Sequence, residues 1–165
     1  MATQLSKYFT LAEALASQTA LVNGFMEQFN PPVEVVNNLT ALHVNVLDPV
    51  RELVGVPVTE SSGYRCPRLN TKVGGEPGSQ HPKGEAADIR AQGYTPDDLY
   101  AKIKASNIAF DQLIIEHDLA GDRWVHISYN VSGEQRGECM KGELQPGGGT
   151  VCVNDGVGSF KTNAA

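Results

Sequence analysis

The chain has 165 residues, of which 41% are hydrophobic and 19% charged, with a formal net charge of -6. This length suits one domain with its own core, and a disordered chain would be poorer in apolar residues. The acidic balance, without a cluster of Lys and Arg, argues against a nucleic-acid partner. No apolar run reaches the ~18 residues of a membrane span, and MATQLSKYFT lacks the layout of a signal peptide. We therefore expect a protein that is made in the cytoplasm and is not inserted stably in a membrane. A monomer is the default expectation for a short single-domain protein.

Helical patterns dominate the first third of the chain. Thr10 and Glu13 form a capping-box pattern, which predicts a short helix over residues 11–17. Apolar residues at three- and four-residue steps predict a longer helix between Pro32 and Gly55, with a bend at Pro49.

Short β-type runs follow: VPVTESSGY, EAADIRA, FDQLIIEH and RWVHISY, separated by Gly and Pro turns. Between the second and third runs, Thr95 and Pro96 begin a predicted helix in TPDDLYAKIKASN. The Gly-rich sequence after Tyr129 predicts a loose hairpin and a mobile tail. The layout indicates an α+β fold, in which residues 1–130 carry the chemistry and residues 131–165 belong to the same domain.

Three cysteines, Cys66, Cys139 and Cys152, are too few and too irregularly spaced for a disulfide framework or a paired CxxC zinc site. Small, partly buried thiols are the ordinary interpretation. Cys139 and Cys152 flank QPGGGT and could meet across a hairpin, so a disulfide there stays open. A nucleophilic Cys66 would indicate an unrelated hydrolase, but no base is marked beside it.

Three residues combine into a candidate metal site. Catalytic zinc requires three ligands drawn from His, Asp and Glu, with one position open. His81 lies in a loop of turn formers, and strand periodicity points Asp88 into covered space, where it needs a cation or several hydrogen bonds. His126 alternates in WVHIS with Trp124 and Ser128 on one strand face. Each residue alone has a structural explanation, but their coincidence favours a metal.

The other two histidines carry different expectations. His43 lies within the long predicted helix, where a partly exposed surface histidine is the simplest interpretation. His117 follows the strand IIE at a turn, and two roles remain open for it: an exposed loop residue or a partner of a zinc-binding histidine.

Four blocks in chain order, SGYRCPRLN, VGG, SQHPKGEAADI and WVHIS, resemble the signature of the zinc D-Ala-D-Ala carboxypeptidase and L-alanyl-D-glutamate endopeptidase family. The fold of this family is shared with the hedgehog signalling domain, and the most similar subgroup contains phage and bacterial peptidoglycan peptidases. The resemblance runs from about residue 8 to 129 and is most specific in S-x-H-x-x-G-x-A-x-D, from Ser79 to Asp88. It implies a small antiparallel sheet packed against helices.

The same resemblance implies roles for single residues. Zn²⁺ would be bound by His81, Asp88 and His126. Arg65 falls where the family keeps an arginine that binds the substrate carbonyl and the oxyanion formed from it, which a fixed cation beside a metal would stabilise. The residues that would orient the ligands or contact substrate are Ser79, Gln80 and Ser128.

The sequence departs from the family pattern at the general base. Several members carry Glu or Asp three residues before the last histidine, and others carry His two residues before it, but here these positions are Arg123 and Trp124. Glu116 and Asp122 are the remaining candidates. Glu116 is favoured, because its strand should pair with the strand of His126. It could instead be a partner of a zinc histidine, and Asp122 has a simpler explanation as a turn residue.

The resemblance thus implies zinc-assisted hydrolysis of peptidoglycan stem peptides or cross-links, by a carboxypeptidase or an endopeptidase. A phage endolysin or a related lytic enzyme, released during lysis or carried in a phage particle, would act in the periplasm or at the cell wall. The alternative is a non-catalytic zinc module that binds cell wall or serves as a phage structural part. The absence of the base from its usual position favours this alternative.

Overall fold

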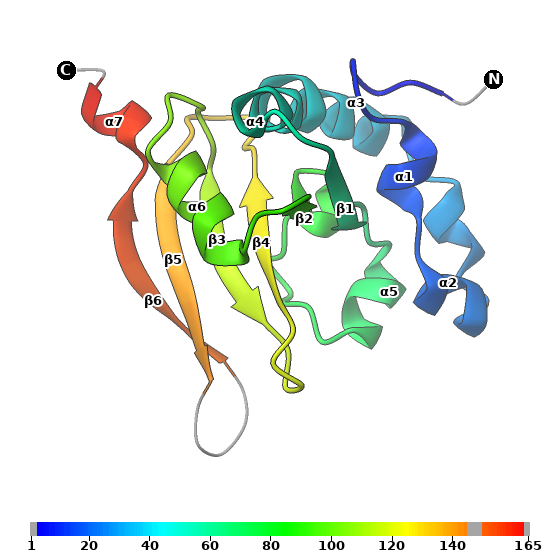
Figure 1. The fold of residues 1–165 in the computed structure, drawn as a ribbon. Helices are drawn as coiled ribbons and strands as arrows, with labels where there is room; N and C mark the ends of the chain where they lie inside the picture. Colours follow the sequence, from blue (N-terminus) through cyan, green and yellow to red (C-terminus); the bar gives the residue numbers. More distant parts are fainter. Residues whose placement is uncertain (1–2, 145–149, 164–165) are drawn as a thin grey trace.

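The computed structural model describes residues 3–144 and 150–163 (Figure 1). It confirms the α+β fold. One six-stranded sheet runs in the order β1-β2-β4-β3-β5-β6. Its strands are β1 Val58–Ser62, β2 Ala86–Ala91, β3 Gln112–His117, β4 Arg123–Ser128, β5 Glu138–Leu144 and β6 Thr150–Val157. The β3–β5 pair is parallel and the other pairs are antiparallel. The sheet is therefore mixed, whereas the resemblance implied an antiparallel one.

Four of the described α-helices precede the first strand in the chain, and the other three follow β1, β2 and β6. They are α1 Leu11–Leu15, α2 Gln18–Asn23, α3 Val33–Leu42, α4 Asp48–Val54, α5 Pro67–Lys72, α6 Pro96–Lys104 and α7 Ser159–Asn163, with 3-10 turns at Met26–Phe29 and His81–Lys83. The capping box of Thr10 and Glu13 is formed, and the Thr95 side chain caps α6. No helix in the described ranges is long and apolar enough to cross a membrane.

The predicted long helix is divided by a π-helical segment, His43–Leu47, between α3 and α4. Asp48 N–H donates to the carbonyl of His43, five residues back. Pro49 has no N–H to offer to the carbonyl of Asn45, so the regular ladder cannot continue through this turn. The irregularity predicted at Pro49 thus occurs in the helical turn that precedes Pro49.

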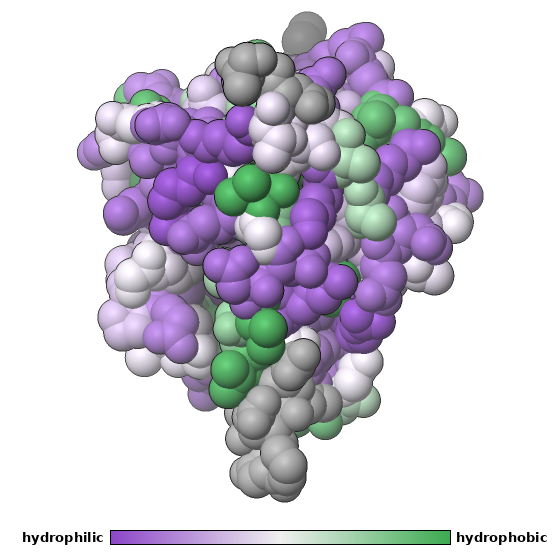
Figure 2. All heavy atoms as spheres, turned by 90° about the vertical axis from the view of Figure 1, so that its left-hand side faces the viewer, coloured by the Kyte–Doolittle hydropathy of each residue, from purple (hydrophilic) through white to green (hydrophobic). Residues whose placement is uncertain are grey.

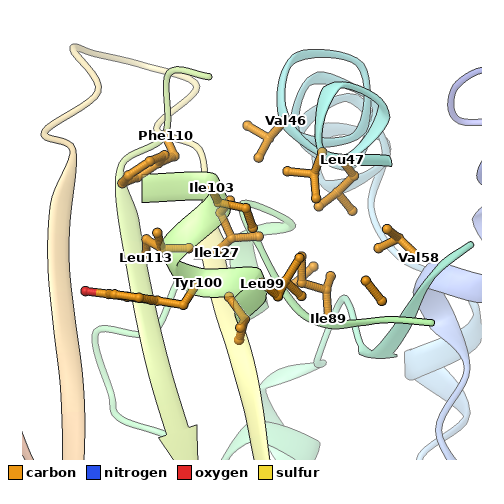
Figure 3. Close-up of a cluster of buried hydrophobic side chains, with 14 of the residues drawn as sticks. Val46, Leu47, Val58, Ile89, Leu99, Tyr100, Ile103, Phe110, Leu113 and Ile127 are labelled. Atoms are coloured by element: carbon orange, nitrogen blue, oxygen red, sulfur yellow. The ribbon is translucent and has the colours of Figure 1, made fainter. Parts of the chain in front are cut away.

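The main hydrophobic core lies between one sheet face and the helices α4 and α6 (Figure 3). Val125 and Ile127 of β4 point into it together with Ile89 of β2, and all three are fully buried. Because side chains alternate along a strand, the intervening residues point to the opposite face. That opposite face carries Asp88 and His126, so the core defines which face holds the candidate site.

The hairpin predicted after Tyr129 is formed by β5 and β6, which extend the sheet beyond β3. The predicted tail contains α7, which packs Phe160 against Phe110, with ring centroids 5.2 Å apart. The glycines at 147–149 lie outside the described residues. β6 is an edge strand with exposed valines, and the face seen in Figure 2 is mainly hydrophilic with small hydrophobic areas.

The three cysteines are free thiols. Cys152 pairs across the hairpin with Gly142, not with Cys139. Cys139 is an odd number of residues from Gly142 along β5, so its side chain lies on the other sheet face, in the core. The two thiols therefore do not form the disulfide that the sequence left open.

Candidate active site and metal centre

Three segments bring the candidate metal ligands together. Asp88 of β2 lies directly opposite His126 of β4 in the antiparallel register, and the turn before β2 supplies His81. Asp88 Oδ1 lies 3.0 Å from His126 Nδ1 and 3.3 Å from His81 Nε2. The two imidazole nitrogens are themselves 3.3 Å apart. One ligand atom from each residue thus lies within 4.8 Å of the others, and all three residues are buried.

The end of β1 orients His81. The Nδ1 atom of His81 lies 2.6 Å from the carbonyl oxygen of Gly63, and an N–H donated there leaves Nε2 unprotonated and able to bind a metal. Gly63 is required by close packing, because a Cβ at this position would lie 2.5 Å from the carbonyl oxygen of Ala14. The glycine of SSGYR therefore allows β1 and α1 to approach closely while its carbonyl holds His81.

The charges of the cluster are strongly coupled. Burial alone would raise the pKa of Asp88, but the neighbouring charges and hydrogen bonds of His81 and His126 hold that pKa well below its usual range. Burial would lower the pKa of His126, whereas Asp88 and then Glu116 raise it. Here the charges and hydrogen bonds of the two imidazoles stabilise the carboxylate. A divalent cation bound to all three side chains can supply this positive charge instead.

Arg65 lies at the edge of the cluster. Its guanidinium Nη2 is hydrogen-bonded to Asp88 Oδ2, and its Nε donates to Ser62 Oγ over 2.8 Å. The side chain is mostly buried, at 15% exposure, so its orientation is fixed by the protein. Arg65 therefore presents a positive charge beside the candidate metal ligands.

The buried amide of Gln28 supports the Arg65 segment, and sequence reasoning did not identify it. Gln28 donates to the carbonyls of Leu15 and Tyr64, over 3.0 and 2.8 Å, and accepts from the N–H of Cys66 over 2.8 Å. The backbone on both sides of Arg65 is thereby tied to the end of α1. No sequence signal marks this role, because the three partners are distant along the chain.

Glu116 lies on the same sheet face as the candidate metal ligands Asp88 and His126. It pairs with Trp124 in the β3–β4 register, and Ile114, two residues earlier, pairs with His126. Residues opposite one another in an antiparallel pair project to the same face, so Glu116 is a diagonal neighbour of His126. Its Oε2 accepts from Trp124 Nε1 over 2.9 Å. The half-buried carboxylate is held by this bond, close enough for its charge to raise the pKa of His126.

Asp122, the other candidate base, has a different environment. It lies in the β3–β4 connection with its side chain 60% exposed, and it pairs with Arg90 over 2.6 Å. The turn itself is stabilised by Asp118, whose Oδ1 accepts from the N–H groups of Ala120 and Asp122. Arg123, where the family pattern has an acid, pairs with Asp97 over 2.5 Å. The geometry therefore favours Glu116 over Asp122.

The remaining predicted residues lie around the cluster or away from it. Ser79 Oγ accepts from the N–H of His81 over 3.3 Å, and Ser128 Oγ accepts from the N–H of Gln112 over 3.0 Å. Gln80 hydrogen-bonds Asp111. His117 is placed elsewhere, with Nε2 2.9 Å from the carbonyl oxygen of Gly142 in β5.

His43 is not a partly exposed surface residue, as the sequence suggested, but is fully buried. Its Nε2 lies 2.8 Å from Glu60 Oε1, and its Nδ1 lies 2.6 Å from the carbonyl oxygen of Leu39. The π-helical segment begins at His43, and the buried carboxylate of Glu60 on β1 supplies the partner that a buried imidazole needs. His43 lies four residues after Leu39 and three before Val46, on the buried face of the helical pattern, which the sequence interpretation did not take into account.

The donor set fits zinc. Two imidazole nitrogens and one carboxylate oxygen form a three-residue set of the kind found at catalytic zinc sites. The orientation of His81 by a backbone carbonyl matches the support that metal-binding histidines receive. Within the described ranges, this is the one group of three or more His, Cys, Asp or Glu residues that could hold a metal ion.

Comparison with known proteins agrees with this geometry. Residues 7–128 match the family model described as Peptidase M15. The match contains all three metal-ligand candidates as well as Arg65 and Glu116, and it ends at Ser128, the last residue of β4. No curated protein matches the chain.

Proposed function

We propose that this chain, which belongs to the peptidase M15 family, is a zinc peptidase that hydrolyses peptidoglycan stem peptides or their cross-links. The observation that carries this proposal is the buried group of His81, Asp88 and His126, with Glu116 on the same sheet face. The cleaved bond is either the terminal D-Ala-D-Ala bond or one within the stem or cross-link. Such a substrate implies action in the periplasm or at the cell wall, as for a phage endolysin.

The chain's own residues supply the remaining steps of hydrolysis. Zinc, when bound by the three ligands, would lower the pKa of a bound water and polarise the scissile carbonyl. Glu116 would accept the proton of the attacking water and then deliver it to the leaving amine. Arg65 would donate its guanidinium N–H groups to the carbonyl oxygen as negative charge develops on it.

Mass spectrometry of defined stem peptides and cross-linked dimers tests the activity, with and without a chelator whose effect zinc reverses. Loss of one alanine identifies a carboxypeptidase, and fragments from within the stem or cross-link identify an endopeptidase. Intact peptides beside a fully zinc-loaded protein would instead support a non-catalytic wall-binding module.

Glu116→Gln tests the assignment of the base. The amide keeps the shape of the side chain and an acceptor for Trp124, but it cannot take a proton, so we expect kcat to fall by about 10²- to 10⁴-fold. Zinc content, measured by elemental analysis, should not change. Asp122→Asn is the matched control and should keep most of the activity, because Asp122 is exposed and paired with Arg90. The reverse result, loss with Asp122→Asn alone, would move the base to Asp122.

A further inference from the structure

A polar groove of about 900 Å³ lies beside the group of candidate metal ligands, His81, Asp88 and His126, and is not used by the proposed chemistry. Gln80, which precedes the ligand His81, lines it, and so does Gln112 of β3. On the site face of β3, Gln112, Ile114 and Glu116 follow one another at two-residue steps, and Ile114 pairs with His126. The candidate metal ligands therefore lie between Glu116 on one side and the groove on the other.

Two different parts of the chain form the walls of this groove. One wall comes from α3 and the turn after His81, with Glu34, Asn38 and Lys83. The other comes from residues 130–136, which follow β4 and lie outside the family match of residues 7–128. A peptide bound across the metal would reach into a space that this chain completes with its own C-terminal segment.

The charged side chains that line the groove carry one more negative than positive charge. Asp111 and Arg136 neutralise each other in an ion pair of 2.6 Å. The other charged side chains lining the groove are Glu34, Glu85 and Lys83, so two carboxylates face one ammonium group. Glu85 uses one oxygen, Oε1, to accept from the N–H of Val131 over 3.3 Å.

Two acceptor groups in the groove lack a donor. The buried Oε1 of Gln80 has no hydrogen-bond partner among the described residues. The exposed carboxylate of Glu34 likewise makes no hydrogen bond or ion pair within the described part of the chain. A primary ammonium group has three N–H donors and a positive charge, which matches both the two acceptors without a partner and the sign of the net charge.

We propose that this groove binds a primary amine of the substrate peptide, on the side of the metal away from Glu116. The chemical class is a wall peptide with a diamino-acid residue whose side-chain amine is free. This inference rests on the proposed function for the identity of the peptide, but the groove and its charge do not depend on the reaction. Glu34 provides the charge contact and acts as a specificity residue.

The test compares two stem peptides that differ only in the side-chain amine, which is free in one and acetylated in the other. We expect the wild-type protein to cleave the free-amine peptide with a kcat/KM about fivefold higher, mainly through KM. Glu34→Gln should remove this preference, so that the ratio of the two kcat/KM values falls to about one. The control Glu27→Gln, an exposed carboxylate outside the groove, should keep the preference.

Equal cleavage of both peptides by the wild type, or an unchanged preference in Glu34→Gln, would overturn the groove assignment and leave the peptidase proposal intact. If neither peptide is cleaved, the proposed function fails. Amide NMR spectra of the zinc-free protein then test separately whether the groove binds the free-amine peptide. Shifts at Lys83 and Val131 with the free-amine peptide only, and absent in Glu34→Gln, would support an amine site. Equal shifts with both peptides, or no shifts, would refute it.

Discussion

Asp88 is buried among two imidazoles and a guanidinium, and this environment explains why the candidate metal ligands could be grouped from the sequence. A carboxylate with 2% exposure needs compensating charge, and the residues that supply it, His81 and His126, lie in short blocks of distinctive composition. The strand alternation of WVHIS also placed His126 on one face with Ser128, as the structure has them. Gln28 could not be predicted in this way, because its contacts are with backbone groups that no residue type marks.

Arg65 is the residue whose proposed role is most directly separable from metal binding. Its guanidinium is fixed by Ser62 and Asp88, and it is not one of the three ligands. Replacing Arg65 with Ala should lower kcat by about 100-fold, because a preorganised donor to the oxyanion is lost. Steady-state kinetics on a stem peptide measures this effect, and elemental analysis should show the zinc content unchanged.

Arg68→Ala provides the comparison, since Arg68 is 61% exposed and pairs with Glu27 away from the cluster. This variant should keep kcat near the wild-type value. Loss of zinc from Arg65→Ala, with activity restored by excess metal, would contradict the oxyanion role. Arg65 would then act by positioning Asp88.

At the scale of elements, strand pairing was easier to predict than helix geometry. The short connection between the runs FDQLIIEH and RWVHISY correctly indicated antiparallel neighbours, and this pairing places Glu116 beside His126. The helix between Pro32 and Gly55 was predicted as continuous, but the π-helical segment changes the direction of every side chain after it. His43 precedes this change and lies on the same helix face as Leu39 and Val46. Its burial was missed because its partner Glu60 lies on a strand that the helical pattern does not indicate.

The His43–Glu60 pair joins the π-helical segment to β1 and should make stability depend on pH. Burial would lower the pKa of His43, but the hydrogen bond and charge of Glu60 raise it overall. A raised pKa in the folded state contributes stability that is complete below the unfolded value of about 6.5 and is lost as pH rises through the folded value. Glu60→Gln should therefore cost about 3 kcal/mol at pH ~6 and less at pH ~9.

Urea unfolding of the wild type and Glu60→Gln at both pH values measures this difference, with a chelator present so that metal binding does not contribute. Other titrating groups are common to both proteins and cancel in the comparison. The His43→Gln variant should show the same trend. A loss of equal size at both pH values would mean that Glu60 stabilises the fold through packing or a neutral hydrogen bond.

At the scale of the whole molecule, the C-terminal segment was the least predictable part. Its Gly-rich, weakly periodic sequence gives little strand signal, and the parallel pairing of β5 with β3 depends on contacts that are not local. Yet β5 covers the side of β3 opposite to β4, and Cys139 joins the main core. The family match ends before this segment, so its role in the fold has to be argued from contacts.

Those contacts predict that a chain ending at residue 130 is strongly destabilised. Asp111 is buried, and the truncation removes Arg136, which pairs with it over 2.6 Å, as well as the hydrogen bonds of β5 to β3. Loss of this ion pair, which solvent screens at the half-exposed Arg136, costs about 2 kcal/mol or less. The lost pairing of β5 with β3 and the exposure of Phe110 to solvent add to this cost. Denaturant unfolding of the truncated and full-length chains measures the difference.

The variant Arg136→Gln separates the ion pair from the strands. Arg136 is half exposed, so solvent screens the pair, and this substitution alone should cost about 2 kcal/mol or less. The truncated chain should lose clearly more, because the pairing of β5 with β3 and the packing of Phe160 on Phe110 are also removed. If the truncated chain unfolds cooperatively at the same denaturant concentration as the full chain, the hairpin is an appendage to a core that is complete at β4. In that case the groove wall formed by residues 130–136 would be the main contribution of this segment.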